Sequence, residues 1–407
     1  MTEVQARVGP ARYAARGAAA VSRRLRGGSG TVIAGRVLQV LAPGGVAAMT
    51  AGRDVTLVSG TNGKTSITAL VAAAFGDDEL VTNRDGANTP AGIAGALATG
   101  ADGRVVLETD EGWLPWAVAE TEPGRVVLSN LSRDQLSRHH EVHAVSASWR
   151  AALAGVPLVV ANADDPAVVW PALAARRQVW VAAGGRWTAD ARTCPACGGS
   201  CRRGAGAWGC TSCDLRRPQP DWWLDGDVLC GRDLRIPLAL DLPGRFNAAN
   251  AALALAAAHS TGVVQLHEAA RRLSDVHAVA GRYERVRFRG HDLRILLAKN
   301  PAGWLELLDL MRDDPYPVVL MFNADGVDGR DPSWLYDVSF APLRGRTVVV
   351  QGRRATDLLV RLELDEVEAR HVRGSLADAV WGLPAGRVDV VGNYTAFRSA
   401  LKEVRHG

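Results

Sequence analysis

The sequence predicts an α/β protein in which a P-loop domain carries a small cysteine-rich insertion and is followed by a second α/β domain. Three observations predict this class. A glycine loop and a lysine join an apolar segment to a helix-forming segment in "VTLVSGTNGKTSITALVAAAFG" (55–76). Two C-x-x-C pairs lie between Gly184 and Gly226, and strand-like and helix-like segments alternate on both sides of them. Alternation of this kind is typical of parallel sheets covered by helices.

The glycine loop has the composition of a phosphate-binding loop. The segment Val55–Val58 is typical of a buried strand, and glycines after it allow backbone N–H groups to approach a polyphosphate. The helix expected from Lys64 points its positive end at the same anion. We therefore expect an ATP site in which Lys64 contacts the β- and γ-phosphates and a hydroxyl of Thr65 or Ser66 ligates Mg²⁺. The full ATP-binding set in this loop is Gly60, Thr61, Asn62, Gly63, Lys64, Thr65 and Ser66. The alternative is a strand–turn–helix whose lysine lies in solvent.

Three further segments are typical of buried parallel strands that end in polar residues: 104–112, 124–130 and 156–165. In open α/β sheets, ligands bind just beyond such carboxyl ends. Glu108 is favoured as the magnesium ligand that acts with Thr65, because Mg²⁺ takes one or two carboxylates together with phosphates. Any of these residues could instead cap a helix. The candidates are Glu108, Asp110, Glu111, Asn130, Asn162, Asp164 and Asp165.

The cysteine-rich insertion, expected at about 184–226, predicts a structural zinc site. Two C-x-x-C knuckles supply four thiolates, and a closed Cys₄ site leaves no position open for a substrate. Cys201 is a possible competitor for one ligand position, and Cys230 is left over. A disulfide would require an oxidising compartment, and a redox pair would require only one knuckle. The zinc ligands expected are Cys194, Cys197, Cys210 and Cys213.

Composition and charge indicate an intracellular protein. The chain has 407 residues, enough for two or three domains, and its net charge of +4 is too small to argue for nucleic acid. It has no apolar run of the ~20 residues that cross a membrane, and its start lacks the features of a signal peptide. We therefore expect a cytoplasmic location.

The first 50 residues are basic. Such a segment could lie on the inner face of an anionic membrane. The favoured interpretation is a solvated surface helix whose alanine face packs on the body. The arginines at its opening are Arg7, Arg12, Arg16, Arg23, Arg24 and Arg26.

The rest of the chain is expected to complete the first domain and form a second. "LDLPGRFNAANAALALAAAHSTG" predicts a strand, a Pro-Gly turn and a helix closing on Gly262, and 279–288 is expected to be a linker. Strand and helix patterns resume from Val286. The expected domains are a basic segment at 1–50, an ATP-binding domain at 51–283 and a second α/β domain at 284–407.

Five motifs in order, "GTNGKTS", "NLSRDQLSRHHE", "NADDP", "LPGRFNAANA" and "GRYE", resemble the central domain of the Mur ligases. Those enzymes make peptidoglycan precursors, and the folylpolyglutamate synthases are related to them. The cysteine insertion, "AKNPAG" and "DGRDPSWLYD" resemble the MurT ligase subunits of lipid II isoglutaminyl synthase. The resemblance implies a Mur-ligase-type P-loop central domain with an inserted Cys₄ zinc ribbon and a C-terminal Rossmann-like domain. It also adds Asn247 and Arg282 to the ATP site.

Some positions depart from the wider Mur pattern. Gln135 stands where many relatives carry a histidine, and Ser137 where they carry an aspartate. Lys299 and Asn300 form "KNP" where ordinary Mur ligases have "HNP". These departures suit an enzyme whose nucleophile is ammonia, which has no carboxylate to bind.

The resemblance implies an ATP-dependent carbon–nitrogen ligase. Lys64, Glu108 and Mg²⁺ would help ATP convert the α-carboxylate of D-glutamate in the lipid II stem peptide to an acyl phosphate. Ammonia from a GatD-like glutaminase partner, paired with the chain as a heterodimer, would then give D-isoglutamine. One alternative is a Mur or folylpolyglutamate-type ligase that adds an amino acid. Another is a non-catalytic nucleotide-binding scaffold with a zinc ribbon.

The resemblance also implies that an aspartate of this chain orients a histidine in the glutaminase. Asp331 is the favoured residue because it matches the family pattern D-x-S-W, with Asp328 and Asp337 as alternatives and Asp325 nearby. A Cys-His pair needs a third group to hold the imidazole tautomer. The competing interpretation is that Asp331 caps a helix starting near Ser333.

Overall fold

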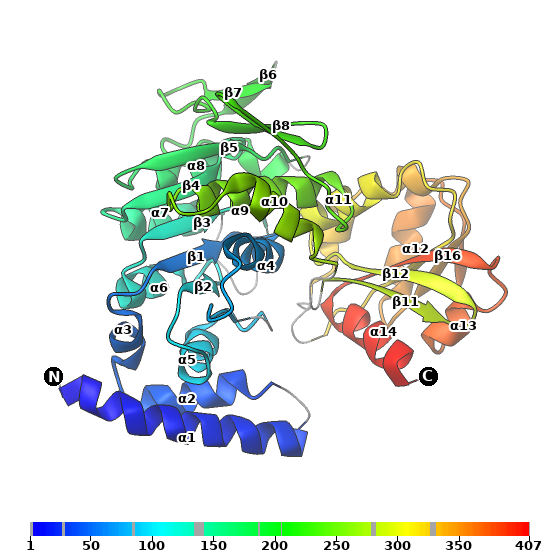
Figure 1. The fold of residues 1–407 in the computed structure, drawn as a ribbon. Helices are drawn as coiled ribbons and strands as arrows, with labels where there is room; N and C mark the ends of the chain where they lie inside the picture. Colours follow the sequence, from blue (N-terminus) through cyan, green and yellow to red (C-terminus); the bar gives the residue numbers. More distant parts are fainter. Residues whose placement is uncertain are drawn as a thin grey trace. The chain divides into compact units, whose positions relative to one another are not determined.

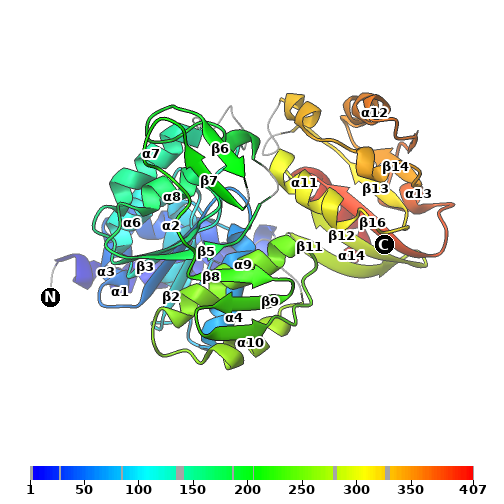
Figure 2. The same cartoon turned by 90° about the horizontal axis from the view of Figure 1, so that it is seen from above.

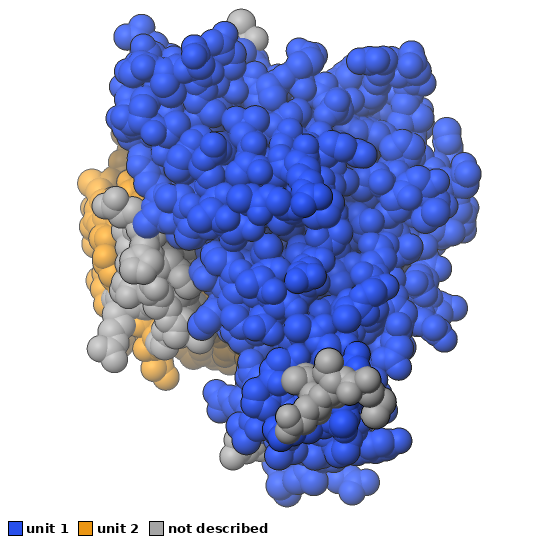
Figure 3. Space-filling view, turned by 90° about the vertical axis from the view of Figure 1, so that its left-hand side faces the viewer, with its two compact units in different colours: residues 1–132, 140–242, 246–277 blue, residues 133–139, 243–245, 278–407 orange. Residues whose placement is uncertain are grey.

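The computed structural model describes residues 3–26, 29–83, 86–133, 142–185, 188–204, 206–277, 282–325 and 331–406. The chain divides into two compact units, coloured separately in Figure 3. The first comprises residues 1–132, 140–242 and 246–277, and the second comprises 133–139, 243–245 and 278–407.

The first unit is built on an eight-stranded sheet with the order β10-β9-β8-β5-β4-β3-β1-β2 (Figures 1 and 2). The strands expected within 104–112, 124–130 and 156–165 are confirmed as β2, β3 and β4, and they lie parallel to β1 or to one another. Strand β5 continues the parallel part, and β8, β9 and β10 form an antiparallel extension. The bounds are β1 Val55–Ser59, β2 Val105–Glu108, β3 Arg125–Leu128, β4 Leu158–Asn162, β5 Gln178–Ala182, β8 Trp222–Asp225, β9 Val228–Gly231 and β10 Leu234–Pro237.

Strand β1 lies between β2 and β3, so the strand order reverses at β1. Ligands of open α/β sheets bind at such a reversal, beyond the carboxyl ends of the strands. The glycine loop follows β1 at this edge, and helix α4 (Lys64–Phe75) begins at the lysine of the loop. The strand–loop–helix order expected from the sequence is therefore confirmed.

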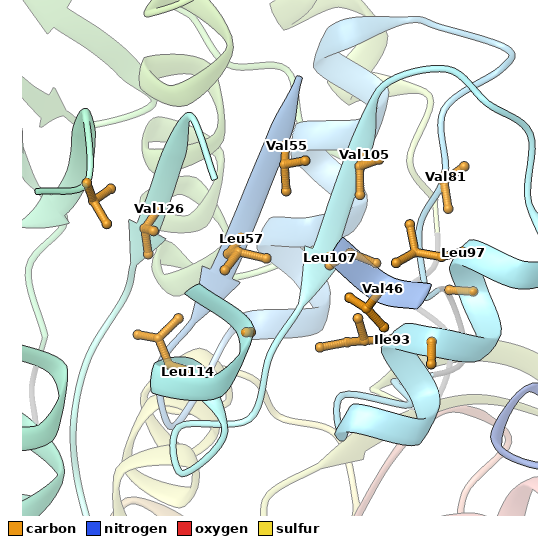
Figure 4. Packing of buried hydrophobic residues seen from close by; sticks show 14 of the residues in the cluster. Val46, Val55, Leu57, Val81, Ile93, Leu97, Val105, Leu107, Leu114 and Val126 are labelled. Atoms are coloured by element: carbon orange, nitrogen blue, oxygen red, sulfur yellow. The ribbon is translucent and has the colours of Figure 1, made fainter. Parts of the chain in front are cut away.

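The core of the first unit lies between the parallel strands and the helices beside them. Leu57 of β1 and Leu107 of β2 face Ile93 and Leu97 of α5, and all four side chains are fully buried (Figure 4). Truncating one such leucine to alanine typically costs about 2–5 kcal/mol of stability. The helices of this unit are α1 Glu3–Arg26, α2 Thr31–Leu41, α3 Gly45–Thr50, α4 Lys64–Phe75, α5 Pro90–Thr99, α6 Leu114–Thr121, α7 Val142–Leu153, α8 Pro166–Ala172, α9 Arg245–His259 and α10 Leu266–Ser274.

The basic start of the chain is helical, and its alanine face packs on the body as expected. Ala11, Ala15 and Ala19 of α1 recur every four residues and are buried. Arg12 donates to the carbonyl of Gly100 at 3.0 Å, and Arg16 donates to that of Ala98 at 3.1 Å. These two arginines satisfy carbonyls at the C-terminal end of α5, where a positive charge is favourable. No helix in the described ranges is both long and apolar enough to cross a bilayer.

Helices α2 and α5 approach each other closely because glycines lie at their contact. A Cβ added to Gly35 would lie 1.6 Å from the carbonyl oxygen of Ala91. A Cβ added to Gly95 would lie 1.9 Å from that of Thr31. Backbone contact therefore requires glycine at both positions.

The cysteine-rich insertion contains a separate two-stranded hairpin, β6 (Cys201–Gly204) and β7 (Ala207–Cys210), after a short 3₁₀ turn at Ala189–Ala191. Trp208 of β7 is buried, and its indole N–H donates to the carbonyl oxygen of Ala163 at 2.9 Å. This bond fixes the hairpin to the end of β4.

The second unit is built on a six-stranded sheet with the order β11-β12-β16-β13-β14-β15. Strands β11 and β12 form an antiparallel hairpin, and the other pairs are parallel. Arg294 of β12 and Asp389 of β16 are register partners, and the buried guanidinium contacts both carboxylate oxygens at 2.7 and 2.8 Å. The elements are β11 Tyr283–Phe288, β12 His291–Leu297, α11 Pro301–Leu310, β13 Val318–Met321, β14 Val348–Gln351, α12 Ala355–Leu364, β15 Ala369–His371, α13 Leu376–Val380, β16 Gly386–Gly392, α14 Tyr394–His406, and 3₁₀ turns at Ser333–Asp337 and Ala341–Leu343.

Two sequence-based assignments are wrong. The segment 279–288 was expected to be a linker, but Tyr283–Phe288 is the edge strand β11, held by its ladder with β12. The strand expected at the start of "LDLPGRF" is also absent from the described residues, since β10 ends at Pro237. Proline has no N–H to donate, so it is a natural end for an edge strand.

Candidate functional site

The glycine loop after β1 requires its glycines for steric reasons. Gly60 has φ 142° and Gly63 has φ 86°, which side chains rarely adopt. A Cβ on Gly60 would lie 2.0 Å from the hydroxyl of Ser129, and one on Gly63 would lie 2.7 Å from Oδ1 of Asn250. The loop is therefore enclosed by the end of β3 on one side and by helix α9 on the other.

The residue that follows Ser129 fixes the loop in position. The N–H of Thr61 donates to the carbonyl of Asn130 at 2.8 Å, and the N–H of Asn62 donates to Oδ1 of the same residue at 3.0 Å. The Asn130 amide in turn donates to the carbonyl of Asn62 at 3.0 Å. The strand-end candidate Asn130 thus shapes the loop.

Lys64 is buried, so the interpretation that places it in solvent is wrong. Its Nζ lies 2.7 Å from Oε2 of Glu111, and it also donates to the carbonyls of Thr61 and Gly60. Both ends of the ion pair are almost completely buried. Burial alone would lower the pKa of Lys64, but Glu111, Glu108 and Asp110 outweigh burial and raise that pKa. The lysine therefore carries its charge at neutral pH.

The two residues expected to ligate magnesium lie next to each other. The Thr65 hydroxyl donates to Oε2 of Glu108 at 2.9 Å, and Asn88 donates to Oε1 at 2.9 Å. The backbone N–H of Glu108 donates to Asn83 at 2.8 Å, which fixes the strand end itself. A hydroxyl and a carboxylate beside a phosphate loop are suitable oxygen ligands for Mg²⁺. Sequence reasoning missed both asparagines, although "TNRDGANTP" is rich in polar residues before α5.

The sequence did not indicate that Glu111 is the carboxylate that pairs with Lys64. It was one of several strand-end carboxylates, but it is the partner of Lys64, and Trp149 of α7 donates to its backbone carbonyl at 2.8 Å. Glu108, Asp110 and Glu111 place three carboxylates around one lysine, so the group is negative overall. A polyphosphate can enter such a site favourably only with a cation.

The remaining residues assigned to the ATP site are placed as follows. Ser66 is buried in the first turn of α4, and Asn247 is buried in α9, where its Oδ1 accepts from Asn250 at 3.3 Å. Asn250 is the residue beside Gly63, so the helix carrying Asn247 borders the glycine loop. Arg282 belongs to the second unit, where its carbonyl accepts from the N–H of Leu297.

Three other strand-end candidates have structural contacts. Asp164 accepts from Arg217 at 2.6 Å and from the N–H of Gly184 at 2.7 Å. Asn162 accepts from the N–H of Asp164, and Asp165 caps α8. These residues hold the cysteine-rich insertion and α8 against β4.

Asp325, Asp331 and Asp337, which the sequence analysis singled out, lie in or before the 3₁₀ turn Ser333–Asp337. Asp331 is exposed, and its Oδ1 accepts from the N–H of Ser333 at 2.9 Å, as the capping interpretation expects. This backbone hydrogen bond lowers the pKa of Asp331. Asp337 lies 3.4 Å from Arg133, and Asp325 lies 3.1 Å from Arg353.

Of the remaining sequence candidates, Asp328, Gln135 and Ser137 lie outside the described residues. Asn300 caps α11 by accepting from the N–H of Gly303 at 2.9 Å, and Lys299 directly precedes this cap.

The four cysteines of the two knuckles converge on one point. Their sulfur atoms all lie within 4.8 Å of one another. Cys194 and Cys213 are 3.7 Å apart, and Cys197 and Cys210 are 3.5 Å apart. Cys201 and Cys230 are outside this group among the described residues.

The backbone around the cysteines also fits a metal. The N–H of Gly199 donates to the sulfur of Cys197 at 3.4 Å, and that of Ser212 donates to the sulfur of Cys210 at 3.3 Å. Each donor lies two residues after its cysteine, and the Ser212 bond lowers the pKa of Cys210 to about 7. Backbone N–H bonds to sulfur stabilise the thiolate, which is the form that binds zinc.

Two family descriptions match this chain. Residues 58–188 match the Mur ligase middle domain, and residues 297–397 match the MurT ligase C-terminal domain. The first range contains the glycine loop and its carboxylates, and the second contains Asp331.

Similar proteins agree with these matches. A Staphylococcus aureus protein named lipid II isoglutaminyl synthase (glutamine-hydrolyzing) subunit MurT is 29% identical over 344 residues, which cover 77% of this chain and 78% of that protein. A pseudomurein peptide ligase type C from Methanothermus fervidus has a TM-score of 0.65 at 17% identity, covering 89% of this chain and 80% of its own. Mycobacterium tuberculosis folylpolyglutamate synthase, solved with ADP, has a TM-score of 0.60 at 16% identity, covering 88% and 92%. The fold is that of the Mur ligases.

The cysteine cluster predicts that purified protein contains about one zinc ion per chain, as a single Cys₄ site requires. Replacing Cys197 or Cys210 by serine should remove the zinc and lower the melting temperature, because the small hairpin has little core of its own. Elemental analysis and thermal melts measure both effects. Cys201→Ser is the matched control and should retain the metal. A disulfide without zinc in the native protein would contradict the assignment.

Asp165 predicts a pH-dependent stability. Burial raises its pKa to about 6, despite N–H donors from Leu131 and Ala167. The folded state therefore holds a proton that the unfolded state releases near pH 4, so stability falls as pH rises through this window. Relative to Asp165→Asn, the native protein should lose about 1 kcal/mol of unfolding free energy between pH 5 and 7. Denaturant unfolding at several pH values measures this difference. A constant difference would show that the pKa of Asp165 does not lie in this window and would contradict the prediction.

Proposed function

Because the chain belongs to the Mur ligase family and has a MurT-type C-terminal domain, we propose that it is the ligase subunit of a lipid II isoglutaminyl synthase. It would convert the α-carboxylate of D-glutamate in the lipid II stem peptide to the amide of D-isoglutamine. The observation that carries this proposal is the match of residues 297–397, since the Staphylococcus aureus relative that bears the MurT name also bears that activity.

The glycine loop would bind the triphosphate of ATP. Gly60 to Ser66 offer backbone N–H groups and the start of α4 to the phosphates. Lys64 would exchange Glu111 for oxygens of the β- and γ-phosphates, because a polyphosphate carries more charge than one carboxylate. Asn247 would contact the nucleotide from α9, and Arg282 is a further candidate contact.

Thr65 and Glu108 would hold the magnesium ion that accompanies ATP. Their oxygen atoms are 2.9 Å apart, and Asn88 orients the carboxylate. When bound, the ion neutralises charge on the transferred phosphoryl group. It would also offset the negative excess that Glu108 and Glu111 create around Lys64.

The reaction needs ATP because a carboxylate resists attack by ammonia. A carboxylate oxygen takes the γ-phosphoryl group, the bond to the β-phosphate oxygen breaks, and ADP leaves. Ammonia then attacks the acyl carbon of the mixed anhydride, inorganic phosphate leaves with the C–O bond electrons, and the nitrogen loses a proton. Lys64 would stabilise the negative charge during phosphoryl transfer.

Ammonia would come from a GatD-like glutaminase subunit. Asp331 is exposed on the second unit, and its hydrogen bond from Ser333 holds the carboxylate in one orientation. An ionised carboxylate held in this way suits the orientation of a histidine on the partner. Supplying this group from the ligase would limit glutamine hydrolysis to the assembled complex.

Removal of the lysine charge should abolish ATP-dependent amidation. Lys64→Ala is expected to lower turnover by about 10²–10³-fold, the typical loss for one group that stabilises a charged transition state. Turnover with ammonium and ATP, measured by mass spectrometry of the stem peptide, tests this. Near-normal turnover at saturating ATP would contradict the assignment.

A matched double variant separates catalysis from folding. Lys64→Ala alone leaves Glu111 buried without its partner, which typically costs about 3–5 kcal/mol of stability. Lys64→Ala combined with Glu111→Gln removes both charges, so it should melt closer to the native protein and still lack turnover. Recovery of turnover in the double variant would show that Lys64 acts only on stability.

Asp331→Asn should separate glutamine hydrolysis by the partner from amidation by this chain. The complex with this variant is expected to lose glutamine-dependent amidation by orders of magnitude while keeping ammonium-dependent amidation, because only the glutaminase loses its orienting group. Co-purification of the glutaminase confirms that the complex still forms, and Asp337→Asn tests the alternative candidate in the same way. Loss with both nitrogen sources would place Asp331 in the ligase site, and loss with neither would leave it as a cap.

A further inference from the structure

Helix α1 has a second apolar face that points away from the body of the first unit. Tyr13, Gly17, Val21 and Leu25 recur every four residues, and this spacing places them along one side of the helix. The fractional exposures of Tyr13, Val21 and Leu25 are 77%, 55% and 78%. We call these three side chains the α1 outer stripe. The buried face of the same helix is formed by alanines instead.

The α1 outer stripe belongs to the stretch of the chain that is richest in exposed large hydrophobic side chains among the described residues. Single exposed hydrophobic residues are normal, whereas a contiguous apolar patch indicates a binding surface. Of the fourteen large hydrophobic side chains that are exposed among the described residues, six lie between positions 13 and 41. Helix α2 contributes Val32 and Val40, which are separated by two turns with Arg36 between them.

The surroundings of the α1 outer stripe are basic. Residues 5–25 include five arginines and no aspartate or glutamate. Arg12 and Arg16 contact the end of α5, and Arg24 is exposed. Arg24 lies three residues after Val21 and thus on the same side of the helix.

We propose that the α1 outer stripe binds the surface of an anionic membrane, with α1 lying in the plane of the bilayer. The three apolar side chains would enter the headgroup boundary, and the nearby arginines would pair with lipid phosphates. From Tyr13 to Leu25 the stripe is about 18 Å long, enough for several lipid headgroups. Figure 1 shows α1 at the border of the first unit, at the end opposite the hairpin β6–β7. This proposal does not depend on the ligase reaction.

Charge and apolarity together favour a lipid surface over the other occupants. A second copy of the chain would bring a second arginine-rich helix against the first, and like charges repel. Nucleic acid would satisfy the arginines but leave the apolar stripe in water. An anionic bilayer satisfies both, because its phosphates lie directly above an apolar layer.

Vesicle binding by the full chain tests this proposal. Wild-type protein should co-sediment with vesicles of phosphatidylcholine and phosphatidylglycerol at a 7:3 ratio, and much less with phosphatidylcholine alone. Val21→Glu combined with Leu25→Glu should weaken this binding about tenfold or more, because two carboxylates replace buried apolar contacts beside anionic lipid. Arg24→Glu should weaken binding and reduce its sensitivity to salt.

The matched control is Val263→Glu combined with Leu364→Glu, which alters two equally exposed apolar residues elsewhere, with exposures of 69% and 64%. It should bind vesicles as the wild type does, and thermal melts check that both double variants fold. Equal binding to neutral vesicles, or an equal loss in the control, would overturn the proposal. So would a wild-type dimer that the stripe variant converts to monomer, or duplex DNA binding that depends on the stripe while vesicle binding does not.

Discussion

The buried ion pair between Lys64 and Glu111 is the interaction on which the arrangement of the first unit depends. A lysine with 3% exposure retains its charge only if an opposite charge lies beside it. That charge comes from Glu111 in the turn after β2, and the loop before the lysine is held by Asn130 after β3. The strand order that places β1 between β2 and β3 is therefore what assembles the loop, its carboxylate partner and its anchor.

The excess of carboxylates around Lys64 decides which ligand suits this loop. Glu111, Glu108 and Asp110 all act on the charge of the lysine. The same excess makes the site unfavourable for a bare polyphosphate and favourable for one that carries a divalent cation. Glu108, which shares a hydrogen bond with Thr65, lies where such a cation would be held.

The sequence predicted the parts of the site that are local and missed those that depend on tertiary contacts. Strand, loop and helix follow one another in the chain, so the glycine spacing around Lys64 is sufficient to predict the loop. The spacing of the cysteine knuckles is likewise sufficient to predict the cysteine cluster. Which of several strand-end acids pairs with the lysine depends on the register between β1 and β2, which no motif encodes. The linker expected at 279–288 contains strand β11. Tyr283 and Phe288 are buried at its two ends, but they point to opposite faces of the strand, so burial does not follow a simple alternation.

Asp331 shows why a structural contact and a catalytic role can belong to one side chain. A carboxylate has about four lone-pair directions, and the Ser333 N–H uses one of them. That bond lowers the pKa of the group, so the carboxylate is ionised at neutral pH, and it also restricts the rotation of the side chain. Both effects are what an orienting group for an imidazole needs, since the histidine must be held in one tautomer by a fixed negative charge. Capping the turn therefore prepares Asp331 for the role we propose, and the two interpretations of this residue are compatible.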